Sequence, residues 1–70
     1  MTIVVRTSKG TVGRMNIFWS KKVVEGVSPL TGELVYAFPQ SVYETVMSNK
    51  GKTVEYVADG VVYHISHYAG

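Results

Sequence analysis

Cysteine is absent from this 70-residue chain, and proline, charge and long apolar runs are scarce. Without cysteine there is no disulfide framework, thiolate zinc site or cysteine nucleophile. No stretch approaches the roughly 18 apolar residues of a membrane-spanning helix. The N-terminus also lacks the charged and apolar regions of a secretory signal. We therefore expect a soluble, cytoplasmic protein with no membrane partner.

The net charge is small. Seven Lys and Arg against five Asp and Glu give +2, far below the dense basic stripe that phosphate neutralisation requires. A local basic patch is still compatible with this total, so charge does not decide between partners. Seventy residues form one compact domain, expected over residues 1–70, and an enclosed substrate cavity would consume its small core.

Most of the chain alternates apolar and polar residues with a period of two, which is typical of β-strands. A turn at residues 8–10 predicts a first hairpin that pairs Val5 with Gly13. Gly13 would mark a bulge or a close approach of another backbone. One face of this hairpin would carry Val4, Arg6, Val12, Arg14, Asn16 and Phe18, and the other Ile3, Val5, Met15, Ile17 and Trp19.

A second hairpin is predicted where Pro29 and Gly32 supply the turn conformations between two β-rich runs. With the loop at residues 29–32, Val27 faces Leu34. The inward side chains would be Leu34, Tyr36 and Phe38.

One helix is predicted over about residues 40–49. Val42, Val46 and Met47 recur at helical spacing, and residues 49–51 provide a stop signal. A helix of about three turns persists only when its apolar stripe packs on the sheet.

A final hairpin is predicted about Asp59 and Gly60, because both central residues of its tight turn need positive φ. This register opposes Glu55 to His64. The apolar face would hold Val54, Tyr56, Ala58, Val61, Tyr63 and Ile65, and the polar face Thr53, Glu55, Val57, Val62, His64 and Ser66. The expected fold is α+β in the order β-β-β-β-α-β-β, a twisted antiparallel sheet of five or six strands with one helix packed across it.

Enzymatic chemistry is not expected. His64 and His67 lie three apart on a strand and point to opposite faces, so they cannot share a metal ion. Ser66 and Thr53 are near His64, but no strained elbow or oxyanion hole accompanies them. The glycines after the first strand lead into another strand, not into a helix that could hold phosphate. We expect no catalytic residue, no cofactor and no bound metal.

Two surfaces are candidates for binding a partner. The first combines arginines with an aromatic ring and a basic corner, comprising Arg6, Arg14, Phe18, Lys21 and Lys22. Arginine and aromatic rings anchor protein interfaces, and they also grip phosphates and stack on bases. A plain solvated face is the other interpretation. The second surface is the polar face of the last hairpin around Glu55, Val57, Val62 and His64.

The hydrophobic content of 46% leaves more apolar side chains than one helix and one sheet can cover. An exposed apolar patch or an open sheet edge would favour a protein partner or self-association. We predict a small interaction module that binds and modulates a macromolecular partner. Compositionally similar domains are common among phage and mobile-element proteins that inhibit a host enzyme. The alternative is an RNA- or single-strand-binding domain.

Residues 34–52, "LVYAFPQSVYETVMSNKGK", resemble part of the KTSC-type domain, which occurs at the tail of some lysyl-tRNA synthetases and as a stand-alone bacterial or phage protein. In both, an aromatic strand passes through an apolar-Pro step into a helix that opens with Val-Tyr-Glu. That family has no settled function and is suspected of binding RNA, so the resemblance transfers little about function. The matching residues are Val35, Tyr36, Phe38, Pro39, Val42, Tyr43, Glu44 and Gly51.

Overall fold

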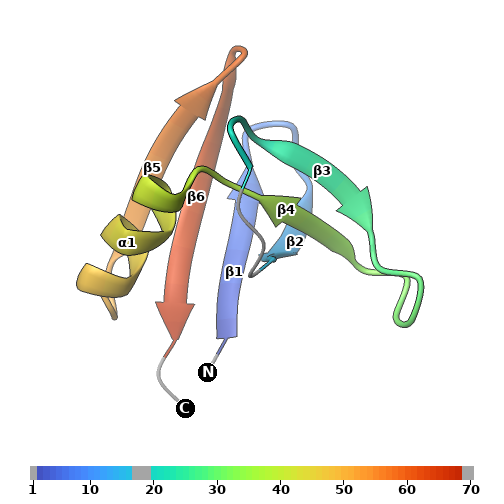
Figure 1. Cartoon of the computed structure of the whole chain (residues 1–70), viewed down its shortest axis with the longest axis horizontal. Helices are drawn as coiled ribbons and strands as arrows, with labels where there is room; N and C mark the ends of the chain where they lie inside the picture. Colours follow the sequence, from blue (N-terminus) through green and yellow to red (C-terminus); the bar gives the residue numbers. More distant parts are fainter. Residues whose placement is uncertain (1, 17–19, 69–70) are drawn as a thin grey trace.

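Six strands and one helix make up residues 2–16 and 20–68, the part of the chain that the computed structural model describes (Figure 1). The helix α1 follows four strands and precedes two, so the predicted α+β fold and element order are confirmed. The elements are β1 (Thr2–Thr7), β2 (Val12–Met15), β3 (Val24–Val27), β4 (Leu34–Ala37), α1 (Gln40–Ser48), β5 (Thr53–Ala58) and β6 (Val61–Tyr68).

The strands form one sheet in the order β3-β4-β2-β1-β6-β5. The first strand therefore lies near the middle and pairs with β2 on one side and β6 on the other. Val5 illustrates this position, because its register partners are Gly13 on β2 and Ile65 on β6. Pairing of β1 with β6 joins the first and last hairpins into one sheet (Figure 1).

One pair of strands departs from the antiparallel arrangement that the sequence predicts. Four of the five neighbouring pairs are antiparallel, but β2 and β4 run parallel, with Arg14 opposite Val35 and Met15 opposite Tyr36. The cause is the position of β3, which lies at the outer edge of the sheet. The chain turns back from β3 into β4, so β4 inserts beside β2 in the same direction as β2.

The three predicted turns are confirmed. In the first hairpin Gly10 has a φ of +87° and Val5 faces Gly13. The second hairpin pairs Val27 with Leu34 as expected. In the last hairpin Asp59 and Gly60 have φ values of +51° and +75°, and Glu55 faces His64. Local turn chemistry therefore sets the register of each hairpin.

The helix packs on one face of the sheet over β5 and β6 (Figure 1). Its buried residues are Val42 and Val46, as the helical spacing predicts. The last helical residue is Ser48, and the Asn49 N–H donates to the Val46 carbonyl at 3.1 Å. The buried core combines the two buried helix residues with side chains of the sheet and of the segment that follows β4. It consists of Val5, Tyr36, Phe38, Val42, Val46, Tyr63 and Ile65.

Aromatic rings make up much of this core. The Phe38 ring meets the Tyr63 ring edge-on at a centroid distance of 5.4 Å, and the Tyr36 ring meets Tyr63 at 5.8 Å. The Tyr36 hydroxyl hydrogen-bonds the Thr11 hydroxyl at 3.0 Å, and Thr11 in turn bonds Thr7. Burial raises the pKa of Tyr36, and the hydrogen bond from Thr11 offsets part of that rise.

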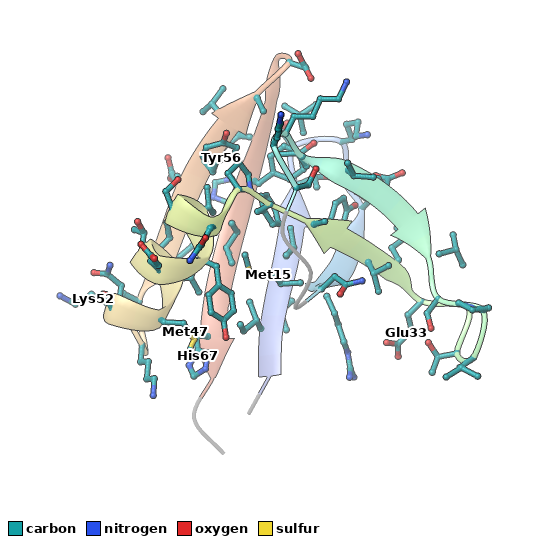
Figure 2. All side chains as sticks on the ribbon, viewed as in Figure 1. Met15, Glu33, Met47, Lys52, Tyr56 and His67 are labelled. Carbon is teal, nitrogen blue, oxygen red and sulfur yellow. The ribbon has the colours of Figure 1, made fainter. Side chains whose placement is uncertain are left out.

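His67 is also buried on the helix side of the sheet, with only 1% of its surface exposed. Neither ring nitrogen has a hydrogen-bond partner among the described residues. Figure 2 shows Met47 of α1 pointing toward this ring. The imidazole therefore occupies the core as a packing group.

Candidate functional site

The sheet has a second face, which the helix does not cover. Residues alternate between faces along a strand, so the neighbours of buried Val5 and Ile65 point away from α1. We call this surface the open face. It comprises Val4, Arg6, Val12, Arg14, Thr53, Glu55, Val57, Val62, His64 and Ser66.

The two candidate surfaces meet on this open face. Arg6 of β1 is the register partner of His64 on β6, and His64 is the register partner of Glu55 on β5. The Nδ1 atom of His64 lies 3.7 Å from Oε1 of Glu55. Arg6 and His64 are more than fifty positions apart in the sequence, and the β1–β6 pairing brings them into one row.

A parallel row lies beside it. Val4 faces Arg14 on one side and Ser66 on the other, and Ser66 faces Thr53. The hydroxyl oxygens of Thr53 and Ser66 are 3.1 Å apart. Between the two rows is a hollow of about 360 Å³, which we call the Arg6 hollow. It is lined by Val4, Arg6, Thr53, His64 and Ser66.

A second hollow, of about 510 Å³, lies toward the β3–β4 loop. Its charged residues are Arg14 and Glu33, and Figure 2 shows Glu33 at the base of that loop. The Arg14 Nε atom lies 3.2 Å from Oε2 of Glu33. We call this the Arg14 hollow, and it is lined by Val4, Val12, Gly13, Arg14, Gly32, Glu33 and Leu34.

The two arginines therefore differ electrostatically. Arg14 is neutralised locally by Glu33, whereas Arg6 forms no ion pair among the described residues. A guanidinium group presents five N–H donors, so Arg6 keeps its donors for a ligand. The ion pairs of the described part are Lys9–Glu25 at 3.7 Å, Arg14–Glu33 at 3.2 Å and His64–Glu55 at 3.7 Å.

The basic corner lies elsewhere. Lys21 and Lys22 are exposed in a bend before β3, and neither lines either hollow. The preceding Ser20 donates its N–H to the Phe38 carbonyl at 3.2 Å, which ties this bend to the end of β4. The predicted site residue Phe18 lies outside the described residues, as do Ile17 and Trp19.

Exposed apolar side chains also lie on the open face. Val12, the register partner of Arg6 on β2, is 58% exposed, and Val57, the register partner of Val62 on β5, is 64% exposed. The ring pairs described in the structure, by contrast, lie on the helix side. They involve Tyr36, Phe38, Tyr56 and Tyr63.

The sequence predicts that Thr53 and Ser66 lie on the polar face of the last hairpin, but it does not identify them as binding residues. Alternation alone identifies that face. What it does not identify is the neighbouring strand β1, which supplies Val4 and Arg6 to the hollow.

The two histidines lie on opposite faces, as the strand geometry predicts. His64 is half-buried on the open face and His67 is buried beneath the helix. Within residues 2–16 and 20–68, no three His, Cys, Asp or Glu side chains gather as a metal site would require.

Comparisons of the chain with protein-family models, curated proteins and solved structures find no match. The resemblance of residues 34–52 to the KTSC-type domain therefore stays a prediction. Among the described residues, no helix has the length and apolar character needed to cross a membrane.

Proposed function

We propose that this chain is a non-enzymatic interaction module that binds a protein partner through the open face and modulates it. The observation that carries this proposal is the β1–β6 pairing, which makes one continuous surface of Arg6, His64 and Glu55. The helix lies on the other side of the sheet, so this surface is left for a partner (Figure 1).

The composition of the open face favours a protein. Exposed Val12 and Val57 provide apolar area, and Arg6 and Arg14 provide a residue type that is enriched at protein interfaces. Glu55 and Glu33 add negative charge at either side. Apolar groups together with charges of both signs are the groups from which protein interfaces build their packing and their electrostatic complementarity.

Nucleic acid is the less favoured partner. A phosphate backbone crossing the open face would pass Glu55 and Glu33, which oppose the attraction of the arginines. Single-strand binding also depends on rings that stack with bases. The described ring pairs lie beneath the helix, away from this face.

The arrangement of hydroxyl groups favours binding over catalysis. A serine nucleophile needs a base that accepts its proton. Here the Ser66 hydroxyl is bonded to the Thr53 hydroxyl at 3.1 Å, while His64 lies against Glu55. Neither interaction directs His64 onto Ser66.

The test is a double substitution, Arg6→Ala with Arg14→Ala. Both side chains are exposed, so the free energy of unfolding should change by less than about 0.5 kcal/mol for each. Binding to a partner captured from a cell lysate should weaken by more than about 1 kcal/mol for each interface arginine. Urea unfolding and titration of the purified partner separate the two effects.

The matched control is Lys21→Ala with Lys22→Ala, which removes the same charge away from the open face. This control should bind normally. Equal weakening by both double variants would indicate attraction by total charge and contradict a specific face. Capture that disappears after nuclease treatment, with affinity falling steeply as salt rises, would show a nucleic-acid ligand instead.

A further inference from the structure

The two hollows of the open face contain one arginine each but offer different electrostatics. In the Arg14 hollow, the Oε2 atom of Glu33 lies 3.2 Å from the Nε atom of Arg14, so this guanidinium is already paired. In the Arg6 hollow, none of the five lining residues is acidic, and Arg6 has no ion pair within the described part of the chain. Of these two hollows in the described part of the chain, the Arg6 hollow is therefore the one whose arginine is not already paired with a carboxylate.

Hydrogen-bond donors surround the Arg6 hollow. Between the hydroxyl groups of Thr53 and Ser66, one proton is used in their mutual bond at 3.1 Å, which leaves the second hydroxyl proton for a ligand. The Nδ1 atom of His64 lies 3.7 Å from Oε1 of Glu55, and in a neutral ring that carries its proton on Nδ1 the Nε2 atom is an acceptor, so His64 donates to an anion only as imidazolium. An arginine, an imidazole and a hydroxyl pair thus come together from three adjacent strands.

The size and lining of the hollow favour an anionic group on a side chain. Its volume of about 360 Å³ exceeds that of a lone small anion, and Val4 adds an apolar surface against which methylene groups can pack. The guanidinium of Arg6 matches the planar, two-oxygen geometry of a carboxylate. Glu55 lies beside His64, so a monoanion experiences less repulsion there than a dianion.

We propose that the Arg6 hollow is a subsite for one carboxylate, provided by an Asp or Glu side chain of the protein partner. This inference rests on the proposed function and names the chemistry that the partner presents. Arg6 is the anchor of the subsite, and the hydroxyl pair of Thr53 and Ser66 orients the carboxylate oxygens.

The experiment uses a blocked Gly-Glu-Gly tripeptide as the probe and a blocked Gly-Gln-Gly tripeptide as its uncharged match. Each is titrated into the isotopically labelled chain at constant ionic strength, and NMR shifts of backbone amides and the Arg6 Nε group are followed. We expect saturable shifts at Arg6, His64, Thr53 and Ser66 with the Glu peptide. The Gln peptide should bind about tenfold more weakly, because charge-assisted hydrogen bonds are the stronger ones.

Three variants locate the effect. Arg6→Gln should weaken binding of the Glu peptide about tenfold, whereas Arg14→Gln should change it less than about twofold, because Glu33 already engages that arginine. Thr53→Val keeps the shape of an exposed strand residue and removes one hydroxyl, so it should weaken binding a few-fold. A dispersed NMR spectrum checks that each variant is folded.

Equal binding of the two peptides, or no loss on Arg6→Gln, would overturn the subsite. Inorganic phosphate is a third probe, and tenfold tighter binding of phosphate than of the Glu peptide would replace the carboxylate with a phosphoryl group. Thr53→Val decides the outcome should Arg6→Gln fail to fold, since an unchanged affinity in that variant also contradicts the subsite.

Failure of the subsite and failure of the proposed function give different results. A partner whose binding depends on Arg6 and Arg14 while the Glu peptide does not bind would keep the function and reject the subsite. A Glu peptide that binds normally while partner capture ignores the double arginine variant would reject the function and keep the subsite.

Discussion

Gly13 shows how a single residue controls contact between strands. A Cβ atom at this position would lie 2.6 Å from the Leu34 carbonyl oxygen and 2.7 Å from the Cε2 atom of Tyr36. The sequence predicts either a bulge or a close approach of another backbone at Gly13, and the structure shows the close approach, by β4. Gly26 on β3 differs, because its nearest neighbour would be the Val35 Cγ2 atom at 4.0 Å.

Gly13→Ala should therefore lower the free energy of unfolding by about 1–3 kcal/mol, the usual cost of overpacking. Part of the collision involves backbone, which cannot rotate away. Gly26→Ala is the control and should be neutral or slightly stabilising, since alanine restricts the unfolded chain more than glycine does. Urea unfolding of both variants measures the difference, and equal midpoints would show that β2 and β4 lie further apart.

Tyr36 gives a second prediction at this scale, which concerns alkaline pH. Its pKa is raised by burial, so the folded state holds the phenolic proton more tightly than the unfolded state, whose pKa is about 10. The stabilisation is complete below that value and is lost as the pH rises through the higher folded pKa. Stability should thus begin to fall above about pH 10.

The measurement is urea unfolding between neutral pH and pH 11, compared with Tyr36→Phe. The phenylalanine variant loses the hydrogen bond to Thr11 and should be less stable by about 1 kcal/mol near neutral pH. Its stability should then decline less steeply with alkali. Parallel curves for the two proteins would mean that other groups govern alkaline unfolding.

At the scale of elements, the hairpins are the most predictable part of the molecule. Their registers depend on short turns, and the last one has its two positive φ values at Asp59 and Gly60. A β-branched side chain at positive φ is strained. Asparagine tolerates that conformation far better.

Gly60→Val should accordingly lower the free energy of unfolding by about 1–3 kcal/mol. Gly60→Asn, the control, should cost much less, because it removes glycine without adding a β-branched side chain. Thermal unfolding compares the variants with the parent chain. If valine left the midpoint unchanged, the turn would have to lie at other residues.

The sequence does not predict which strands of different hairpins pair with one another. The period-two pattern of β1 identifies Val5 as a core residue but contains no information on whether Ile65 or another strand lies beside it. The parallel pairing of β2 with β4 cannot be predicted from the sequence for the same reason. The sequence predicts each candidate surface separately, and their meeting at Arg6 and His64 depends on this long-range pairing.

At the scale of the whole molecule, the strand order brings the two ends of the sequence together. Thr2 on β1 is the register partner of Tyr68 on β6, so the first and last strands are neighbours along their whole paired length. The loop between β3 and β4 lies at the periphery, and its residue Leu30 is 94% exposed. We therefore expect the same sheet to form when the two ends are joined and the chain is opened in the loop between β3 and β4.

A circular permutant tests this arrangement. Residues 70 and 1 are joined by a short Gly/Ser linker, and the chain is opened between Leu30 and Thr31. We expect cooperative urea unfolding and a loss under about 2 kcal/mol, because loop closure costs change only slowly with loop length. A permutant opened between His64 and Ile65 interrupts a central strand and should not fold; similar behaviour of the two permutants would contradict the strand order.

The place of β6 also has a consequence for the timing of folding during synthesis. It lies between β1 and β5, yet it is made after every other strand. Until it emerges, β1 lacks a neighbour on one side and α1 lacks half of the sheet on which it packs. Such sequence-distant contacts slow folding and leave a strand edge open to chaperones or to aggregation. The sheet can therefore be completed only after β6 has been synthesised, so the rate of translation sets the earliest time at which the open face forms.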